Sequence, residues 1–198
     1  MERLKLTKGF FCLLSLVVLT QCHFSSLSSD FREGKEDVAE KRYPAAVKKL
    51  ERVIRRDPEG ELGVEAARLA AKVAHYEIKD YKKAIEFYNH LVNYSGVDAE
   101  RKESQKRIAE IYFENLNEYK KSIEEFNKLL ALKNTKDEAI SYKLKIGKAN
   151  FYLNNFFQAE SEVDSAIKLA DEKEAQFELL QFLASIYYNT KRIYEAIK

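Results

Sequence analysis

Four small residues along the chain each begin the same spacing of apolar positions. The small residues are Ala46, Ala84, Ser122 and Ala159, and apolar or aromatic residues follow four, seven and eight positions later. Those residues are Leu50, Val53 and Ile54; Tyr88, Leu91 and Val92; Phe126, Leu129 and Leu130; and Val163, Ala166 and Ile167. Because this spacing lines one face of an α-helix, each segment is predicted to be a helix that buries that face.

A large side chain precedes each small residue by three positions and recurs at a nearly constant interval. These residues are Tyr43, Tyr81, Tyr119 and Phe156, with Ile193 before Ala196 in a fifth copy. Successive members are 38, 38, 37 and 37 residues apart. A period of this length predicts an array of one supersecondary unit rather than a single interwoven domain. Such arrays form extended surfaces suited to holding other proteins.

Longer periodic stretches lie between these helices. Residues 61–79, 98–116 and 136–153 contain almost no Gly or Pro, and each is predicted to form a helix of four to five turns. The repeating unit is therefore a helical hairpin. Thr135 and Glu138 have the spacing of a capping box. Asp80, Asn117 and Asn155 stand just before second helices, where a short acceptor side chain can cap free amides.

The pattern resembles the tetratricopeptide repeat, a family that favours small and aromatic residues at fixed places in such a hairpin. The matching residues are Gly34, Tyr43, Ala46 and Pro58; Tyr81, Ala84 and Tyr88; Phe113, Tyr119, Ser122 and Phe126; Gly147, Phe156, Ala159 and Ala166; and Ala184, Tyr187 and Ala196. The resemblance covers about residues 28–198. It implies an all-α fold, a right-handed superhelical solenoid of about five hairpins near 30–58, 62–96, 98–134, 136–171 and 172–198, the last incomplete.

The chain departs from the family pattern in three ways. Asp37 and Asn150 stand where an aromatic residue is usual, so their hairpins are expected to pack less tightly. The period exceeds the usual length of roughly 34 residues, and about one extra helical turn per unit would accommodate the difference. The fifth unit reaches only Lys198. An array that continues further is the favoured expectation, and cover by a partner or a second copy is the alternative.

The N-terminus has the form of a secretory signal. Arg3, Lys5 and Lys8 precede an apolar run over residues 9–19, which is shorter than the roughly 20 residues of a membrane span. The segment Leu19-Thr20-Gln21-Cys22 resembles the bacterial lipobox, whose cysteine becomes the lipid-bearing N-terminus after cleavage. Gln21 departs from that motif, in which a small residue is usual. A plain cleaved signal and an uncleaved anchor are the alternatives.

This interpretation divides the start of the chain into two segments. Residues 1–21 are predicted to be the signal peptide, and residues 22–29 a Ser-rich tether that follows the lipidated Cys22. By resemblance to Gram-negative lipoproteins, the lack of Asp after Cys22 favours the outer membrane over the inner membrane. The expected location is the bacterial cell envelope, lipid-anchored and facing the periplasm.

Charge is balanced overall but unevenly distributed. Without residues 1–21 the chain has 31 basic and 31 acidic residues, which argues against a nucleic-acid binder. A basic group comprises Lys41, Arg42, Lys48, Lys49, Arg52, Arg55 and Arg56, and an acidic group comprises Glu160, Glu162, Asp164, Asp171, Glu172, Glu174 and Glu178. The functional interpretation places the basic end beside an anionic membrane. The alternative, ordinary solvated helix faces, is the more common meaning of such runs.

The sequence contains no recognisable catalytic motif. The histidines are His23, His75 and His90; His75 occupies a core aromatic position of the family, and His90 is expected to face solvent. No His-x-x-x-His pair, phosphate-binding Gly-rich loop or Gly-x-Ser-x-Gly turn occurs. We therefore predict a non-enzymatic protein without a cofactor, metal site or small-molecule substrate.

The resemblance also implies where a partner binds. In tetratricopeptide proteins the first helices line a concave groove, which suits an extended peptide or a helix. The corresponding residues include Leu69, Val73 and Tyr76; Arg107, Ile111 and Glu114; Lys148 and Phe151; and Ser185 and Tyr188. For Leu69, Val73 and Ile111, packing between hairpins is an equally weighted alternative.

Signal, lipid-type cysteine and longish repeats together most resemble BamD-type lipoproteins of the outer-membrane β-barrel assembly machinery. The resemblance implies a membrane-anchored scaffold that binds protein partners. A pilotin-like lipoprotein for pilus or secretion-pore assembly, or a coordinator of cell-wall enzymes, is the alternative.

Overall fold

The structure is a computed structural model that describes residues 26–191. The chain forms two compact halves, an N-terminal half that ends at Gly96 and a C-terminal half that begins at Val97. The predicted signal peptide, Cys22 and the helix expected from Ile193 lie outside the described residues.

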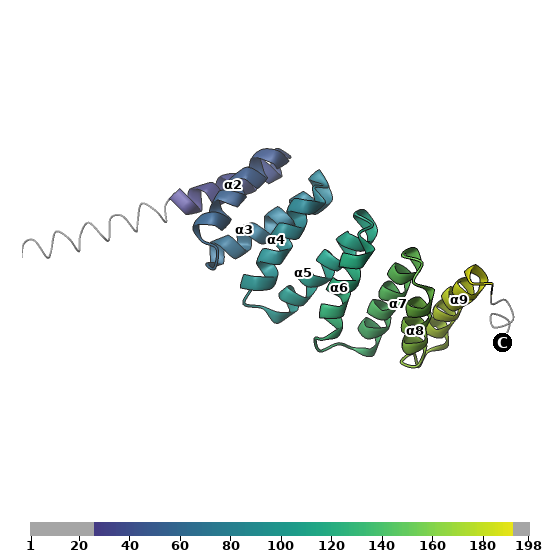
Figure 1. Ribbon diagram of the computed structural model, residues 1–198. Helices are drawn as coiled ribbons and strands as arrows, with labels where there is room; N and C mark the ends of the chain where they lie inside the picture. Colours follow the sequence, from purple (N-terminus) through teal and green to yellow (C-terminus); the bar gives the residue numbers. More distant parts are fainter. Residues whose placement is uncertain (1–25, 192–198) are drawn as a thin grey trace, which may run out of the picture. The chain divides into compact units, whose positions relative to one another are not determined.

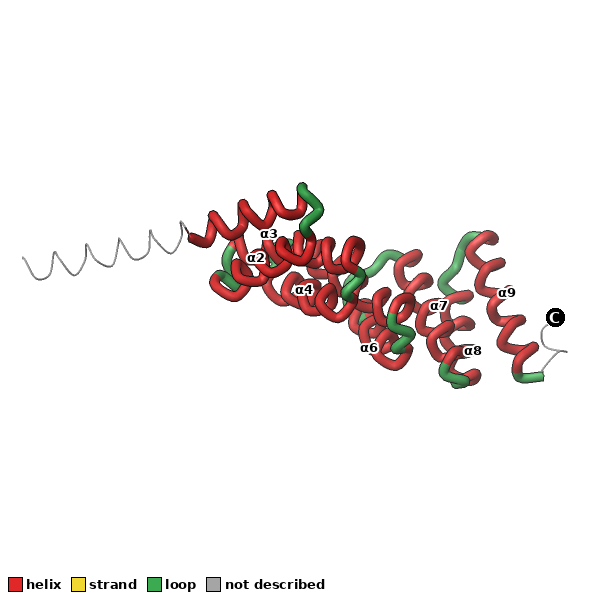
Figure 2. Tube along the Cα trace, turned by 90° about the horizontal axis from the view of Figure 1, so that it is seen from above, coloured by secondary structure: helices red, strands yellow, loops and turns green. Residues whose placement is uncertain are grey.

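Both halves consist of consecutive helices. In the N-terminal half, a helix over residues 26–39 precedes α2 (Tyr43–Arg56), α3 (Glu61–Lys72), the π-helical turn η1 (Val73–Ile78) and α4 (Tyr81–Tyr94). The C-terminal half contains α5 (Asp98–Glu110), the π-helical turn η2 (Ile111–Asn115), α6 (Tyr119–Leu130), α7 (Lys136–Tyr152), α8 (Phe156–Ile167) and α9 (Lys173–Asn189). Figure 1 and Figure 2 show these helices joined by short loops, and residues 26–191 contain no strand. The predicted all-α array of hairpins is confirmed.

The array begins earlier than the sequence indicated. Residues 26–29, assigned to the tether, are already helical. Leu27 is buried, and Ser26 Oγ accepts a hydrogen bond from Arg56 at 3.2 Å. A Ser-rich composition suggested a linker, but one buried leucine and a contact to α2 fix this segment in the first hairpin.

Two of the four predicted helix caps are present. Thr135 Oγ1 accepts from the Glu138 backbone N–H at 3.2 Å, and Glu138 Oε2 accepts from the Thr135 N–H at 2.8 Å. Asp80 Oδ1 accepts from the Lys83 N–H at 3.1 Å. The predictions for Asn117 and Asn155 are wrong, because neither side chain caps a helix. Their side chains instead contact Tyr119 and Asn150, respectively.

A residue with positive φ follows the first helix of each hairpin in residues 26–191. These residues are Lys41, Lys79, Asn117, Asn154 and Lys191, with φ between 52° and 60°. Each lies two positions before the large residue that marks the repeat, so the backbone repeats at the sequence period. A left-handed residue just past a helix end is a common C-terminal stop, usually supplied by glycine. Here lysine and asparagine take that position.

The π-helical turns explain why the period is 38 residues in some places and 37 in others. The helix preceding Tyr81 runs through α3 and η1, and the one preceding Tyr119 through α5 and η2. The helices α7 and α9 contain 17 residues each and have no π-helical turn. A π-helical turn takes up one additional residue within a helix.

The buried positions show the same offset of one residue. Ala66, Ala70 and Val73 lie 15, 11 and 8 residues before Tyr81, as do Ser104, Ile108 and Ile111 before Tyr119. In α7, Tyr142, Ile146 and Ala149 lie 14, 10 and 7 residues before Phe156, as do Leu179, Leu183 and Ile186 before Ile193. The extra residue therefore leaves the core arrangement unchanged on both sides of the π-helical turn.

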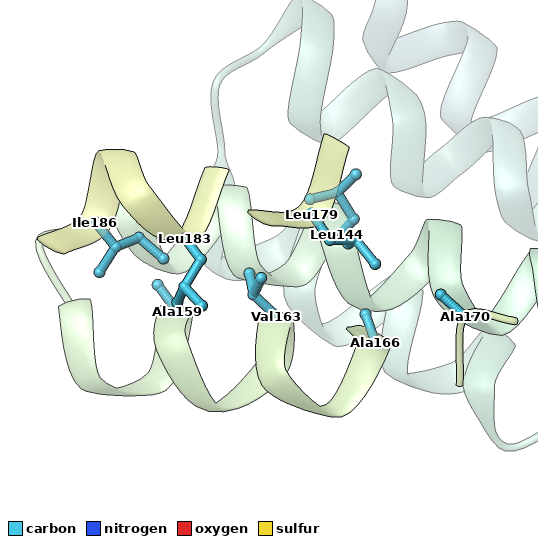
Figure 3. Close-up of a cluster of buried hydrophobic side chains, with 8 residues drawn as sticks. All are labelled: Leu144, Ala159, Val163, Ala166, Ala170, Leu179, Leu183 and Ile186. Atoms are coloured by element: carbon cyan, nitrogen blue, oxygen red, sulfur yellow. The ribbon is translucent and has the colours of Figure 1, made fainter. Parts of the chain in front are cut away.

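Small residues let neighbouring helices approach closely, both within one hairpin and between successive hairpins. Figure 3 shows Ala159, Val163 and Ala166 of α8 beside Leu183 and neighbouring apolar side chains of α9. A Cβ atom at Gly147 would lie 3.0 Å from Val163 Cγ2 and 3.4 Å from the Ala159 carbonyl oxygen. Because large apolar groups interdigitate over these small residues, the core is continuous from α7 to α9.

Asp37 and Asn150, the polar residues at aromatic positions, are both buried. Asp37 forms ion pairs with Arg42 at 2.5 Å and with Lys49 at 2.8 Å. The hydrogen bond from Lys49, followed by that from Arg42, lowers the pKa of Asp37 below its usual value. Asn150 donates to the Ile146 carbonyl at 3.1 Å. The loose packing expected here is not found. Polar contacts replace the missing ring, and Gly34 approaches Leu50 as closely as Gly147 approaches Val163.

Candidate functional site

The groove residues of the N-terminal half lie on α3 and η1. Tyr76 is 52% exposed and stacks on His75 with ring centroids 4.2 Å apart. Leu69 is half-buried. Val73 is buried and cannot contact a partner in this conformation.

On the first helix of the third hairpin, only part of the predicted set reaches the surface. Arg107 is half-buried and forms ion pairs with Glu103 at 2.7 Å and Glu110 at 3.1 Å. Glu114 is exposed. Ile111 is fully buried, so it belongs to the core.

The π-helical turns account for the two buried predictions. Val73 and Ile111 lie eight residues before Tyr81 and Tyr119, as Lys148 lies eight residues before Phe156. Counting alone therefore assigns them the surface position that Lys148 holds in α7. With the extra residue included, they match Ala149, which is also buried. The surface position belongs to Lys72 and Glu110, which the sequence analysis missed. A comparison of apolar spacing among the hairpins is the signal that could have found them.

The remaining predicted residues lie on α7 and α9. Lys148 is half-buried, Phe151 is half-buried, Ser185 is exposed and Tyr188 is 73% exposed. Phe151 packs edge-on against Phe182 of α9 at 5.6 Å and against Phe156 of α8 at 5.5 Å between centroids. Thus Ser185 and Tyr188 are accessible to a partner, whereas Phe151 mainly joins neighbouring helices.

Ion pairs link the first helices of the C-terminal half. Lys145 of α7 binds Glu114 at 2.6 Å, and Lys148 binds Glu178 of α9 at 3.3 Å. The same lysines lie over aromatic rings, Lys145 over Phe113 at 4.8 Å and Lys148 over Phe182 at 5.8 Å. Each lysine thus forms one ion pair and one cation–π contact within the protein. Both lysines of this face are therefore already engaged within the protein.

A connected series of ring contacts runs through the hairpins of the C-terminal half, and we call it the aromatic row. Its members are Phe113, Tyr119, Tyr152, Phe151, Phe156 and Phe182. Tyr119 and Tyr152 stack at 4.8 Å, and Phe113 meets Tyr119 edge-on at 5.6 Å. Since aromatic pairs add stability beyond burial, the row joins three hairpins firmly.

The surroundings of His75 agree with the sequence prediction, whereas those of His90 do not. His75 is half-buried within hydrogen-bonding distance of the Tyr88 hydroxyl, at 3.3 Å, which confirms its predicted packing role. His90 is half-buried rather than solvent-facing. Burial lowers the pKa of His90, and the Pro58 carbonyl partly opposes that change.

Carboxylates of the first helix neutralise most of the basic group. Arg52 binds Asp30 at 2.6 Å, and Arg56 reaches the same carboxylate at 3.2 Å. Lys49 binds Glu33 at 3.2 Å in addition to Asp37. In the acidic group, Glu162 pairs with Lys143 at 3.2 Å and Asp171 with Lys136 at 2.5 Å. Internal pairing of this kind favours the solvated-face alternative over a membrane-binding basic end.

None of the helices in residues 26–191 has the length and apolar character needed to cross a membrane. In the same residues, no group of three or more His, Cys, Asp or Glu side chains is arranged to hold a metal ion.

No protein-family model matches the chain, and no curated protein is significantly similar in sequence. Solved structures do resemble it. MamA superimposes with a TM-score of 0.60 at 17% identity, covering 87% of this chain and 86% of MamA. The apo form of RapI gives 0.63 at 15% identity, over 87% of this chain and 51% of RapI, so the chain spans about half of RapI.

A third similar structure is itself a repeat protein. It contains the nearly identical TPR-like repeats of a Podosopora anserina protein described as a kinesin light chain. It gives a TM-score of 0.55 at 15% identity, over 86% of this chain and 89% of that one. The chain has a tetratricopeptide-like helical-repeat fold. At these identities the likeness establishes the fold alone, and function has to be argued from the residues.

Proposed function

We propose that this tetratricopeptide-like chain is a protein-binding scaffold, held at the bacterial cell envelope by a lipid on Cys22. It performs no reaction of its own. The observation that carries the proposal is that first helices in each half present exposed side chains, Tyr76 in the N-terminal half and Ser185 and Tyr188 in the C-terminal half. Extended helical-repeat surfaces are suited to holding a peptide or a helix.

The charges of the C-terminal half indicate how that surface recognises a partner. Glu114, Lys148 and Glu178 are already paired within the protein. Recognition then depends on aromatic and uncharged contacts, with Tyr188 as the largest accessible side chain. Binding at this surface should therefore weaken little as salt is raised.

The envelope location rests on the signal-like N-terminus and the lipobox-like segment that ends at Cys22. We propose that residues 1–21 are removed, that acylated Cys22 holds the array in the periplasm, and that the membrane is the outer one. Two or more acyl chains on one residue suffice for stable anchoring. Feeding cells a palmitate analogue tests this step. Label should be lost in Cys22→Ser and kept in Cys12→Ser, and retention of label by Cys22→Ser would refute the anchor.

Within the envelope, a BamD-like role in assembly of outer-membrane β-barrel proteins is the finer proposal. Affinity purification from detergent-solubilised membranes should recover a large β-barrel protein. A double variant, Ser185→Arg with Tyr188→Ser, should lose that protein. The matched control is Lys133→Ser, an exposed change in the α6–α7 loop. Recovery of pilus or secretin subunits would instead support the pilotin-like alternative, and recovery of cell-wall enzymes the third one.

A further inference from the structure

The helix α9 is apolar on two opposite sides. On one side, Leu179, Leu183 and Ile186 belong to the core cluster that α9 forms with α7 and α8 (Figure 3). Residues at helical spacing recur on the other side, and we call them the α9 stripe: Phe177, Leu180, Ala184 and Tyr188. In that stripe Phe177 is 63% and Leu180 50% exposed. A surface helix of a globular protein normally has one apolar side, so the α9 stripe is typical of a second packing surface.

The corresponding side of α7 shows what such a stripe contacts. The equivalent residues lie 37 positions earlier and are Ile140, Lys143, Gly147 and Phe151. There Lys143 binds Glu162 of α8 at 3.2 Å. A Cβ atom at Gly147 would lie 3.0 Å from Val163 Cγ2, also of α8. The second helix of the hairpin therefore covers this side of α7, and a helix in the same place would cover the α9 stripe.

One position of the α9 stripe differs in chemistry from its counterparts. Lys143 donates to Glu162, and the corresponding residue of α5, allowing for η2, is Gln105, which donates to Glu125 of α6 at 2.5 Å. Both glutamates lie six residues after the first residue of their helix. In α9 this position is Leu180, which cannot pair with a carboxylate. A helix that covers the α9 stripe therefore needs an apolar residue opposite Leu180, because a glutamate would be buried there without a partner.

Residues 193–198, which lie outside the described residues, do not include that apolar counterpart. By sequence they correspond to residues 156–161 of α8, and the place of Glu162 is the next one along the chain. The α9 stripe also contains Tyr188, an exposed residue of the proposed groove. This shared residue connects the helix that covers Leu180 with the partner of that groove.

We propose that the partner is an amphipathic helix of another protein, which packs along the α9 stripe in the manner of α8 on α7. This inference rests on the proposed scaffold function and deepens it, because that function admits either an extended peptide or a helix. The contacting side of the partner helix has a small residue in the place of Ala159 and apolar residues in the places of Glu162 and Val163. Burial of apolar surface then drives the association.

The test uses two fluorescent peptides with the sequence of residues 155–170, which include α8. One peptide keeps Glu162 and the other carries Glu162→Leu. The full-length chain is used as wild type and as Leu180→Lys, which supplies the donor that Lys143 provides in α7. The control variant is Leu132→Lys in the α6–α7 loop, since Leu132 is 47% exposed and thus closely matches Leu180. Thermal unfolding first establishes that both variants are folded.

Fluorescence anisotropy should show that the wild type binds the Glu162→Leu peptide at least about tenfold more tightly than the unmodified peptide. Leu180→Lys should reverse this preference, because its ammonium group pairs with glutamate and is left without a partner opposite leucine. Leu132→Lys should keep the wild-type preference. Only a helix in the register of α8 places the exchanged residue opposite Leu180, so the reversal reports how the peptide docks.

Three results would overturn the proposal. The first is failure of the wild type to bind either peptide, the outcome expected if residues 192–198 cover the α9 stripe. The second is a peptide preference that Leu180→Lys leaves unchanged, which would place the peptide elsewhere. The third is self-association of the wild type that Leu180→Lys abolishes in sedimentation equilibrium, because the occupant would then be a second copy of this chain.

The pull-down described above separates this inference from the scaffold function. If the wild type recovers a β-barrel protein that Ser185→Arg with Tyr188→Ser loses, but binds neither peptide, the scaffold stands and the helical partner is rejected. If the peptide preference reverses as expected but no protein is recovered from membranes, the assembly role fails and the α9 stripe stands as a helix-binding surface.

Discussion

The hairpins α5–α6 and α7–α8 bury equivalent faces although their first helices differ by one residue. In α5 the extra residue is taken up by η2, and Ile111 remains in the core where α7 has Ala149. The helix α7 lacks this extra residue, and it buries Ala149 without a π-helical turn. The comparison teaches that side-chain burial, rather than residue count, fixes how these helices align. The hairpin α3–α4 repeats the arrangement with η1.

Deleting one residue from each first helix should give the largest contrast. Removal of Tyr112 shortens the period to that of α7–α8, so η2 should become ordinary α-helix at a cost of about 1 kcal/mol for the lost Lys121 contact. Removal of Ala149 rotates the preceding part of α7 by about 100° and withdraws Ile146 from the core, costing about 3 kcal/mol or more. Urea unfolding measures both. Equal losses would contradict the role given to the π-helical turn.

The next largest difference in unfolding free energy should separate a substitution at Ile111, which the sequence wrongly placed at the surface, from one at Lys148. Ile111→Ala should lower the free energy of unfolding by about 3 kcal/mol, because it removes a fully buried side chain. Lys148→Ala should cost less than about 1 kcal/mol, because it removes a partly exposed ion pair. If Ile111 lined a groove, the two variants would have similar midpoints in urea.

Acid should affect the hairpin α3–α4 before it affects the hairpins α5–α6 and α7–α8, which contain no histidine. Burial lowers the pKa of His90, so the unfolded chain binds its proton more readily and stability falls as pH drops below about 6.5. Discounted for partial exposure, the loss should be below about 1 kcal/mol. Thermal unfolding between neutral and mildly acidic pH measures it, and His90→Gln should flatten the profile. Asp37, whose pKa is lowered, loses its contribution only at more acidic pH.

The smallest contrast concerns the left-handed turn residues. Lys79→Gly should stabilise the chain by about 0.5 kcal/mol, because glycine adopts the positive φ without strain while losing more entropy on folding. Asn117→Gly should change little, since asparagine already tolerates this conformation. Differential scanning calorimetry can resolve the pair. Destabilisation by Lys79→Gly would show that its side chain contributes more than its backbone costs.

The sequence predicted the features that depend on local pattern. The stretch 98–116 matches the helix that ends at Asn115, and the stretch 136–153 matches α7 to within one residue. The Thr135 and Glu138 capping box is present because both partners lie within one turn. Spacing of apolar residues is sufficient for such features, since each is decided by neighbours along the chain.

The features that were missed depend on contacts between hairpins or on one-residue changes of register. No composition rule reveals that Ser26 contacts Arg56 or that His90 is half-buried. The surface assignment failed at Val73 and Ile111 because counting from a marker assumes an unbroken α-helix. A π-helical turn adds one residue to the helix without a recognisable sequence signal. Only the one-residue offset of the buried positions reveals it.

Glu138 has a consequence for how the C-terminal half loses its structure. The carboxylate that closes the first turn of α7 also binds Lys102 of α5 at 2.8 Å, and that lysine is the main reason why the pKa of Glu138 is lowered. Fraying of α7 would thus break a link to the preceding hairpin at the same time. Neighbouring modules then melt together, and thermal denaturation of this half should follow one steep transition instead of successive local ones.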